Sequence, residues 1–141
     1  MKYEIYTEDF PPFSCPEIIQ LTDLSLYNFN SAIGEFHKQV KWSDMWNYEE
    51  ANNRLKQDWK LLTFTPEYNT LGWFWLNVRN QSVHNLWIHS DWRNEGWGTR
   101  MYLAITNLAK ELKIGYLQTY VDDWNVAGQR VAEKAGWKLV L

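Results

Sequence analysis

The sequence predicts a mixed α/β fold in which helices flank a central, largely antiparallel sheet. Two observations lead to this prediction. Three β-rich segments follow one another between residues 60 and 89, which indicates an antiparallel meander, and the second half of the chain reads as strand, helix, strand, helix, strand. The length of 141 residues fits a single domain over 1–141 with a sizeable core.

The first third of the chain has weaker patterns. We expect a short strand at 3–6, a turn at Pro11 and Pro12, and weakly helical segments within 17–38. Ser43 is a suitable N-cap for a helix over 44–58, because acidic residues follow it early and apolar residues recur at helical spacing. These apolar residues are Met45, Tyr48, Leu55 and Trp59.

The meander comes next along the chain. Strands are expected over 60–65, 70–78 and 83–89, because these runs are rich in aromatic and β-branched residues. Turns are expected at 66–69 and 79–82, where Pro, Asn and Ser interrupt the runs.

The clearest helix of the sequence follows the meander, and Gly115 is expected to end it. A strand over 116–121, a helix over 125–134 closed by Gly136, and an apolar segment over 138–141 complete the chain. The helix that directly follows the meander presents one broad apolar stripe. The stripe comprises Trp97, Met101, Ala104, Ile105, Leu108 and Leu112.

Composition argues against several classes of protein. Lys and Arg number 14 against 17 Asp and Glu, so the net charge of −3 does not favour nucleic acid or an anionic membrane as a partner. Cys15 is the single cysteine, which excludes an internal disulfide, and with three scattered histidines it does not supply a zinc site, so no metal is expected. The N-terminus lacks an apolar signal-peptide block and no stretch is long enough to span a membrane, so we expect a cytoplasmic protein.

Ten tryptophans are unusual for this length, and we interpret them mainly as packing residues. A stacking platform for single-stranded nucleic acid is an alternative, but the charge balance argues against it. Cys15 as a nucleophile is a further alternative, although the sequence pairs it with no placed histidine.

The loop and first helical turn after residue 88 are the most informative part of the sequence. Gly96 and Gly98 allow the backbone to approach a ligand closely, and the unpaired amides of a first helical turn form a seat for a phosphate. Taken alone, two glycines also fit a tight turn followed by close helix packing.

Two patterns at the right separation resemble the signatures of the GNAT superfamily of acyl-CoA-dependent N-acetyltransferases. The first signature, on a strand and the start of the central helix, is matched by Leu86, Ile88, Arg93, Gly96 and Gly98. The second signature, on the following strand and helix, is matched by Asn125, Gly136 and Trp137. Within it, Gly128 replaces the usual alanine and Ala132 replaces the usual tyrosine.

The resemblance implies acetyl-CoA as co-substrate, with the pantetheine arm lying against the main chain of the strand that ends at His89. Arg93 and Arg100 would add positive charge near the phosphates. Asn125 would touch the arm from the other side, or cap the last helix, or do both. The strand residues in contact would be Trp87, Ile88 and His89. The pyrophosphate would be held by the backbone of Asn94, Glu95, Gly96, Trp97, Gly98 and Thr99.

In this family a neutral amine attacks the acetyl carbonyl directly, so the acceptor amine has to lose its proton. Candidate bases are His84, His89, Asp122 and Asp123. Strand alternation predicts that His84 shares a face with Leu86 and Ile88, whereas Trp87 and His89 lie on the other face.

The general acid is missing from its usual place. Ala132 stands where the family has a tyrosine that protonates the leaving thiolate, so Tyr120, Tyr116 or water would have to substitute. The acceptor would be a small-molecule amine or a peptide or protein amino group. The alternative is a catalytically weak or inactive CoA-binding or structural member of the same fold.

The sequence also departs from the family at its C-terminal end. Five residues follow Gly136, so we expect the fold to be truncated at the C-terminal strand that usually pairs beside the fifth. This would leave an open sheet edge at 116–121 or 138–141. Three outcomes are open: a partner chain covers the edge in a homodimer, a rearranged N-terminal strand covers it, or it stays uncovered.

Overall fold

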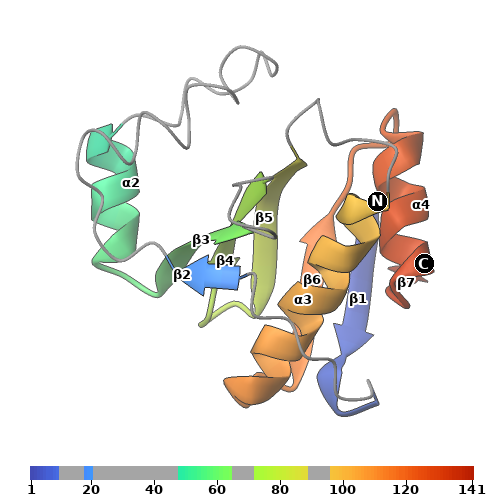
Figure 1. Cartoon of the computed structure of the whole chain (residues 1–141), viewed down its shortest axis with the longest axis horizontal. Coiled ribbons are helices and arrows are strands. Elements are labelled where there is room, and N and C mark those ends of the chain that lie inside the picture. Colours follow the sequence, from blue (N-terminus) through green and yellow to red (C-terminus); the bar gives the residue numbers. More distant parts are fainter. Residues whose placement is uncertain (10–17, 21–47, 65–71, 89–95) are drawn as a thin grey trace.

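The computed structural model describes residues 1–9, 18–20, 48–64, 72–88 and 96–141, which form a single sheet with helices around it (Figure 1). The elements are β1 (Lys2–Tyr6), η1 (Thr7–Asp9), β2 (Ile18–Gln20), α2 (Tyr48–Leu55), β3 (Trp59–Phe64), β4 (Gly72–Asn77), β5 (Ser82–Ile88), α3 (Trp97–Glu111), β6 (Tyr116–Tyr120), α4 (Val126–Lys134) and β7 (Lys138–Val140). The predicted fold class is confirmed. No helix among the described residues is long and apolar enough to cross a membrane.

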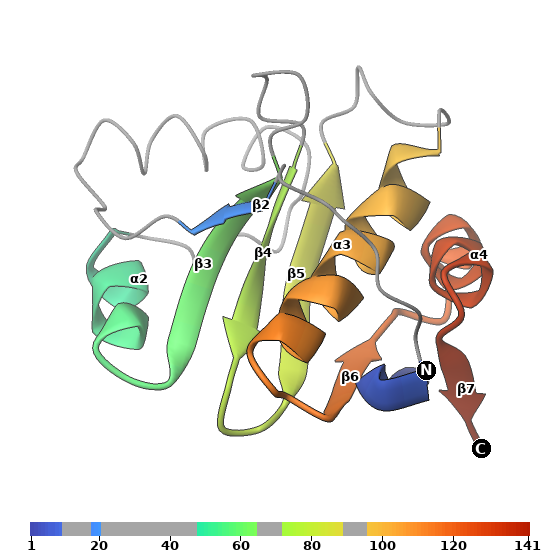
Figure 2. The same cartoon turned by 60° about the horizontal axis from the view of Figure 1, so that its bottom comes forward.

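The strands form a seven-stranded sheet in the order β2-β3-β4-β5-β6-β1-β7. β3, β4 and β5 pair as the predicted antiparallel meander, and β5 then pairs in parallel with β6. Figure 2 shows α3 lying across β5 and β6, with α2 beside β3 and α4 beside β7. The parallel step therefore falls in the middle of the sheet, under α3.

The first strand of the chain occupies the position that the family resemblance assigns to a C-terminal strand. β1 lies between β6 and β7 and is antiparallel to both, so that Lys2 is opposite Tyr120 on one side and Val140 on the other. Of the three outcomes considered for the open edge of β6, the structure shows the rearranged N-terminal strand. A homodimer through the remaining edge at β7 stays a prediction.

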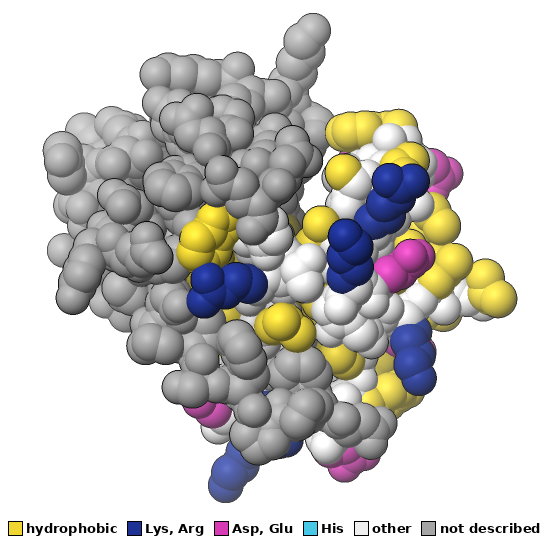
Figure 3. All heavy atoms as spheres, turned by 45° about the vertical axis from the view of Figure 1, so that its right-hand side comes forward, with side chains coloured by type: hydrophobic (Ala, Val, Ile, Leu, Met, Phe, Trp, Pro, Cys, Tyr) yellow, Lys and Arg dark blue, Asp and Glu magenta, His cyan; other side chains and the backbone are white. Residues whose placement is uncertain are grey.

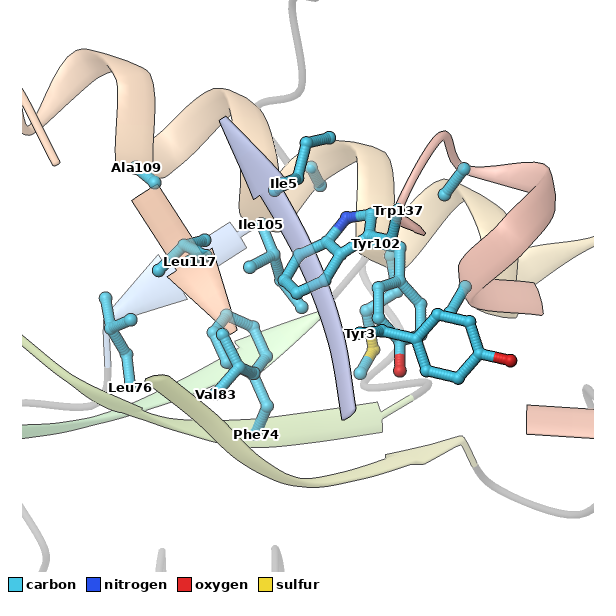
Figure 4. Close-up of a cluster of buried hydrophobic side chains, with 14 of the residues drawn as sticks. Tyr3, Ile5, Phe74, Leu76, Val83, Tyr102, Ile105, Ala109, Leu117 and Trp137 are labelled. Carbon is cyan, nitrogen blue, oxygen red and sulfur yellow. The ribbon is translucent and has the colours of Figure 1, made fainter. Parts of the chain in front are cut away.

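The core lies between the sheet and the helices α3 and α4 (Figure 4). Tyr3, Tyr102 and Trp137 come together there, and the rings of Tyr102 and Trp137 meet edge to face with centroids 5.2 Å apart. The Trp137 indole nitrogen donates to the Thr106 hydroxyl at 3.1 Å, and the Tyr3 hydroxyl donates to Glu133 at 2.9 Å. The polar groups of Trp137 and Tyr3 are thus satisfied.

Two helix predictions need correction. Residues 18–20 form strand β2, paired antiparallel with β3, instead of part of a helical segment, because Ile18 to Gln20 complete the ladder beside Phe64 to Leu62. The helix predicted over 44–58 is described from Tyr48 and ends at Leu55, because the chain turns before entering β3. The rest of 17–38, residues 44–47 and the expected turns at 11–12 and 66–69 lie outside the described residues.

The two later helices end differently. α3 ends at Glu111, not at Gly115, because Lys113 takes the left-handed conformation with φ of 61° and the Ile114 amide donates back to Ala109. α4 ends as predicted, with Gly136 at φ of 91° just after its last turn. The structure therefore places the left-handed residue after α3 on a lysine, which the sequence pattern does not indicate.

Candidate functional site

The parallel strands β5 and β6 run together over a short distance only. They are in register at two pairs, Ser82 with Gln118 and Val83 with Thr119, and the Thr119 hydroxyl donates to the Val83 carbonyl at 2.9 Å. In the described parts of these strands no later residue is in register, although β5 continues to Ile88. We call Val83 and Thr119 the divergence point, because β6 no longer follows β5 beyond it.

A β-bulge in β5 lies just past the divergence point. Trp75 of β4 is opposite His84, whereas Trp73 of β4 is opposite Trp87, so two residue steps on β4 correspond to three on β5. An extra residue of this kind bends the strand that carries it. The bulge therefore accounts for the departure of β5 from its parallel neighbour.

The bulge also changes which side chains share a face. Residues opposite one another in a sheet share a face, so His84 and Trp87 lie with Trp75 and Trp73 on the face away from α3, which we call the back face. Leu86 and Ile88 instead pack against the core under α3. The prediction that His84 shares a face with Leu86 and Ile88 is therefore wrong.

His84 is held by neighbours on three sides. Its Nε2 atom lies 2.7 Å from the Ser82 hydroxyl, and its ring lies 4.9 Å from that of Trp59. The guanidinium of Arg54 in α2 lies over Trp59 at 4.7 Å and over Trp75 at 5.5 Å. Burial, and secondly the positive charge of Arg54, lower the pKa of His84, so the imidazole is neutral at neutral pH and has the protonation state of a base.

Tyr120 lies on the same face as His84. Val83 and Thr119 are the last pair in register, and His84 and Tyr120 each follow one residue later on their strands, where successive side chains alternate between the two faces. Tyr120 is 67% exposed, and the exposed Asp122 follows it in the loop to α4, where its carbonyl accepts from the Asn125 amide at 2.9 Å. Two candidate groups, an imidazole and a phenol, thus lie on the back face, each one residue past the divergence point on its own strand.

Tyr116, the other tyrosine considered as an acid, lies at the opposite end of β6. Its hydroxyl donates to Glu4 at 2.6 Å, and burial together with this hydrogen bond raises the pKa of Tyr116 to about 12. Tyr116 is opposite Tyr6 of β1, three residues before the divergence point. It is therefore not placed to act there.

The N-terminus of α3 has the features of an anion seat. Its N-cap residue is Gly96, which has φ of 82° and no side chain to cap the helix, and the first turn contains no acidic residue. The amides of Trp97, Gly98 and Thr99 thus begin a 15-residue helix whose N-cap residue offers no side-chain oxygen to accept from them. A Cβ on Gly96 would meet nothing within 4 Å, so its left-handed backbone, not crowding, calls for glycine.

Gly98 has a different structural reason. A Cβ at Gly98 would lie 3.1 Å from a methyl group of Val131, so this glycine permits the close approach of α3 and α4.

Figure 3, which views the side of the molecule with these helices, shows several Lys and Arg side chains despite the net negative charge. Arg100, whose guanidinium lies 4.6 Å over the Trp97 ring, and Arg130 are exposed residues of α3 and α4.

Asn125 caps α4, as predicted, by accepting from the Gly128 amide at 2.9 Å. A Cβ on Gly128 would come within 2.6 Å of the Asn125 amide nitrogen, which explains glycine where the signature has alanine.

Ala132 is completely buried in the core, so a tyrosine there would require repacking of its neighbours. The remaining predicted residues, His89, Arg93, Asn94 and Glu95, lie outside the described residues.

Sequence reasoning missed three residues around His84, namely Arg54, Trp59 and Ser82. The spacing of Ser82 and His84 on one strand is a local signal that places both on one face. The contacts of Arg54 and Trp59 with this face depend on tertiary packing and have no local signal. Within the described residues, no group of three or more His, Cys, Asp or Glu side chains is arranged to hold a metal ion.

Solved structures share this fold at low sequence identity. A conserved protein of unknown function from Staphylococcus epidermidis ATCC 12228 matches 97% of this chain at 12% identity with a TM-score of 0.70. A Drosophila protein matches 99% at 13% identity with a TM-score of 0.73. The present chain spans 56% and 47% of these two chains, about half of their length.

A third structure, from Vibrio cholerae and assigned as a ribosomal-protein-serine acetyltransferase, matches 90% of this chain and 83% of its own at 15% identity, with a TM-score of 0.61. No curated protein matches the sequence significantly. The family profile described as "Acetyltransferase (GNAT) domain" matches residues 6–138, nearly the whole chain. The chain therefore belongs to the GNAT acetyltransferase family.

Proposed function

We propose that this protein moves an acetyl group from acetyl-CoA to a primary amine by direct attack, at the point where β5 and β6 diverge. The observation that carries the proposal is the combination of this divergence with the N-terminus of α3, whose N-cap residue is the left-handed Gly96. GNAT domains use acetyl-CoA as co-substrate. When bound, it supplies an activated thioester.

The residues toward the coenzyme have distinct tasks in this proposal. The first-turn amides from Trp97 to Thr99 bind the pyrophosphate, favoured by the positive end of the α3 dipole. The main chain of β5 through Trp87 and Ile88 lies along the pantetheine arm, and Asn125 contacts the arm while it caps α4. His89, Arg93, Asn94 and Glu95 continue this site in sequence.

The residues toward the acceptor handle the protons. His84, neutral and oriented by Ser82, accepts a proton from the acceptor's ammonium group, and the resulting amine attacks the acetyl carbonyl. A carbon–nitrogen bond forms and the carbon–sulfur bond breaks. The attacking nitrogen releases its second proton to solvent, and Tyr120 donates a proton to the departing thiolate and regains one from solvent. Asp122, exposed beside Tyr120, favours the approach of a cationic acceptor.

The buried Ala132 favours the alternative, a member of the family that binds CoA and has little or no turnover. Two measurements distinguish the readings: calorimetry with acetyl-CoA and with desulfo-CoA, and release of free thiol across a panel of amines. We expect binding of both coenzymes and release with some amines. Binding without release would support the alternative, and absence of binding would contradict both.

A further inference from the structure

The back face contains a cavity at the end of the sheet where β4 turns into β5, which we call the hairpin pocket. Its volume is about 430 Å³, within the range of small-molecule sites. The pocket is lined by Gln57, Asp58, Trp59, Asn77, Arg79 and Asn80. The GNAT signatures and the proposed coenzyme site use none of these residues.

The register of the sheet places His84 one row beyond this pocket. Trp59 is opposite Asn77, and Asn77 is opposite Ser82, so these three residues form one row across the back face. Trp75 and His84 form the next row, two residues along the strands, which is about 6–7 Å away. Trp59 and Asn77 of the first row line the hairpin pocket. Trp59 and Ser82 of the same row support His84, through the 4.9 Å ring contact and the hydrogen bond.

Hydrogen bonds hold the hairpin in place. The Asn77 side chain accepts from the Asn80 amide at 2.9 Å, and the Asn80 carbonyl accepts from the Gln118 side chain at 3.2 Å. The Asp58 carbonyl accepts from the Val78 amide at 2.9 Å, which joins the entry to β3 to the same turn. These hydrogen bonds hold the backbone that carries the lining residues, and a preorganised backbone reduces the entropy cost of binding.

The lining side chains combine one guanidinium, one carboxylate, three amides and one indole. A guanidinium in the fork geometry of arginine is suited to a carboxylate, and a carboxylate is suited to an ammonium group. Resting on the proposed function of His84, we infer that the hairpin pocket binds the acceptor, and that this acceptor is a small zwitterion carrying a carboxylate as well as the amine. Arg79 binds the carboxylate, Asp58 attracts the ammonium group, and His84 in the next row takes the proton.

The test is an NMR titration of the nitrogen-15-labelled protein with three matched probes: β-alanine, n-propylamine and propionate. We expect β-alanine to shift the Trp59 indole resonance and the amides of Arg79 and Asn80 in a saturable way. Because Arg79 is exposed, the preference for β-alanine over n-propylamine should be about fivefold in affinity. Arg79→Leu should remove this preference, Arg79→Lys should keep part of it, and Arg130→Leu, which changes an exposed arginine of α4, should leave it intact.

Equal binding of β-alanine and n-propylamine, or shifts that avoid the hairpin pocket, would overturn the inference. These outcomes are independent of the proposed function, which thiol release tests separately. If amines without a carboxylate are acetylated as well as β-alanine, the zwitterion inference fails and the acetyltransferase proposal stands. If the pocket resonances respond selectively but no acetyl-CoA binds, the acetyltransferase proposal fails and the pocket remains as a binding site.

Discussion

The back face of the sheet has two halves with opposite surroundings. Over β4 and β5 it is tryptophan-lined and buried, with Trp73 and Trp75 completely inaccessible. Over β6 and β1 it carries exposed tyrosines, with Tyr120 at 67% and Tyr6 at 53% exposure. The divergence point separates these halves, so the proposed base lies in a preorganised environment and the proposed acid lies in water.

This difference has a chemical consequence. His84 is oriented by the Ser82 hydroxyl and the Trp59 ring, an orientation that a solvent water acting as the base would lack. Tyr120 is exposed enough that solvent can protonate the leaving thiolate in its place. Loss of the base should therefore cost more than loss of the acid.

The largest effect is expected for His84→Gln, which keeps a polar side chain of similar size but cannot accept the proton. Loss of a general base costs roughly 10²–10⁴-fold in rate, so kcat/KM for the best amine should fall by that factor. Acetyl-CoA affinity measured by calorimetry should not change, because the phosphate seat is on α3. A decrease in kcat/KM of less than about threefold would show that His84, in the buried half of the back face, is not the general base.

The next effect concerns Ala132→Tyr, which restores the family residue at a completely buried position. Overpacking a core costs about 1–3 kcal/mol, so the free energy of unfolding in urea should drop by that amount. Catalysis should not improve, because the ring would enter the core and not the divergence point. Ala127→Tyr, at an exposed position of the same helix, is the control and should leave stability almost unchanged. If the variant kept its free energy of unfolding and turned over faster, position 132 would be the site of the general acid, and the expectation would be wrong.

A smaller effect is expected for Tyr120→Phe, which removes only the hydroxyl of the exposed half. Because water can protonate the thiolate there, kcat should fall by about tenfold or less, at the weak end of general acid effects. Tyr6→Phe, at another exposed tyrosine of the same face, should have no effect on kcat. If Tyr120→Phe lowered kcat more than His84→Gln, the comparison of the two halves would be reversed.

Local patterns in the sequence predicted much of this architecture. The meander, the two later helices, the Asn125 cap and the Gly136 terminus were all legible from spacing and residue type. The position of β1 was not, because its partners Tyr116 to Tyr120 are more than a hundred residues away and many strands would satisfy the same alternation. Long-range pairing of this kind leaves no local signal.

The candidate site was predictable to a lesser degree than the fold. His84 and Tyr120 were identified by residue type, but the bulge between His84 and Trp87 has no glycine to mark it, so the face of His84 was predicted incorrectly. The environment of His84 depends on Arg54, which reaches it from α2 through the Trp59 ring. Such contacts arise only when distant elements pack together.

The smallest effect, and the most specific test of the buried half, is a change in pH dependence for Arg54→Met. Burial first and the Arg54 charge second lower the pKa of His84, so removing the charge should raise this pKa toward its ordinary value of about 6.5. As pH falls, His84 should then become protonated earlier, and the acidic limb of the kcat/KM profile should move to higher pH, with the same direction in an NMR titration of the imidazole. Arg54→Lys, which keeps the charge, and Lys56→Met, which removes an exposed charge nearby, should leave the limb in place. A limb that moves with Lys56→Met as much as with Arg54→Met would mean that overall charge, and not the stack of Arg54 on Trp59, sets the protonation of His84.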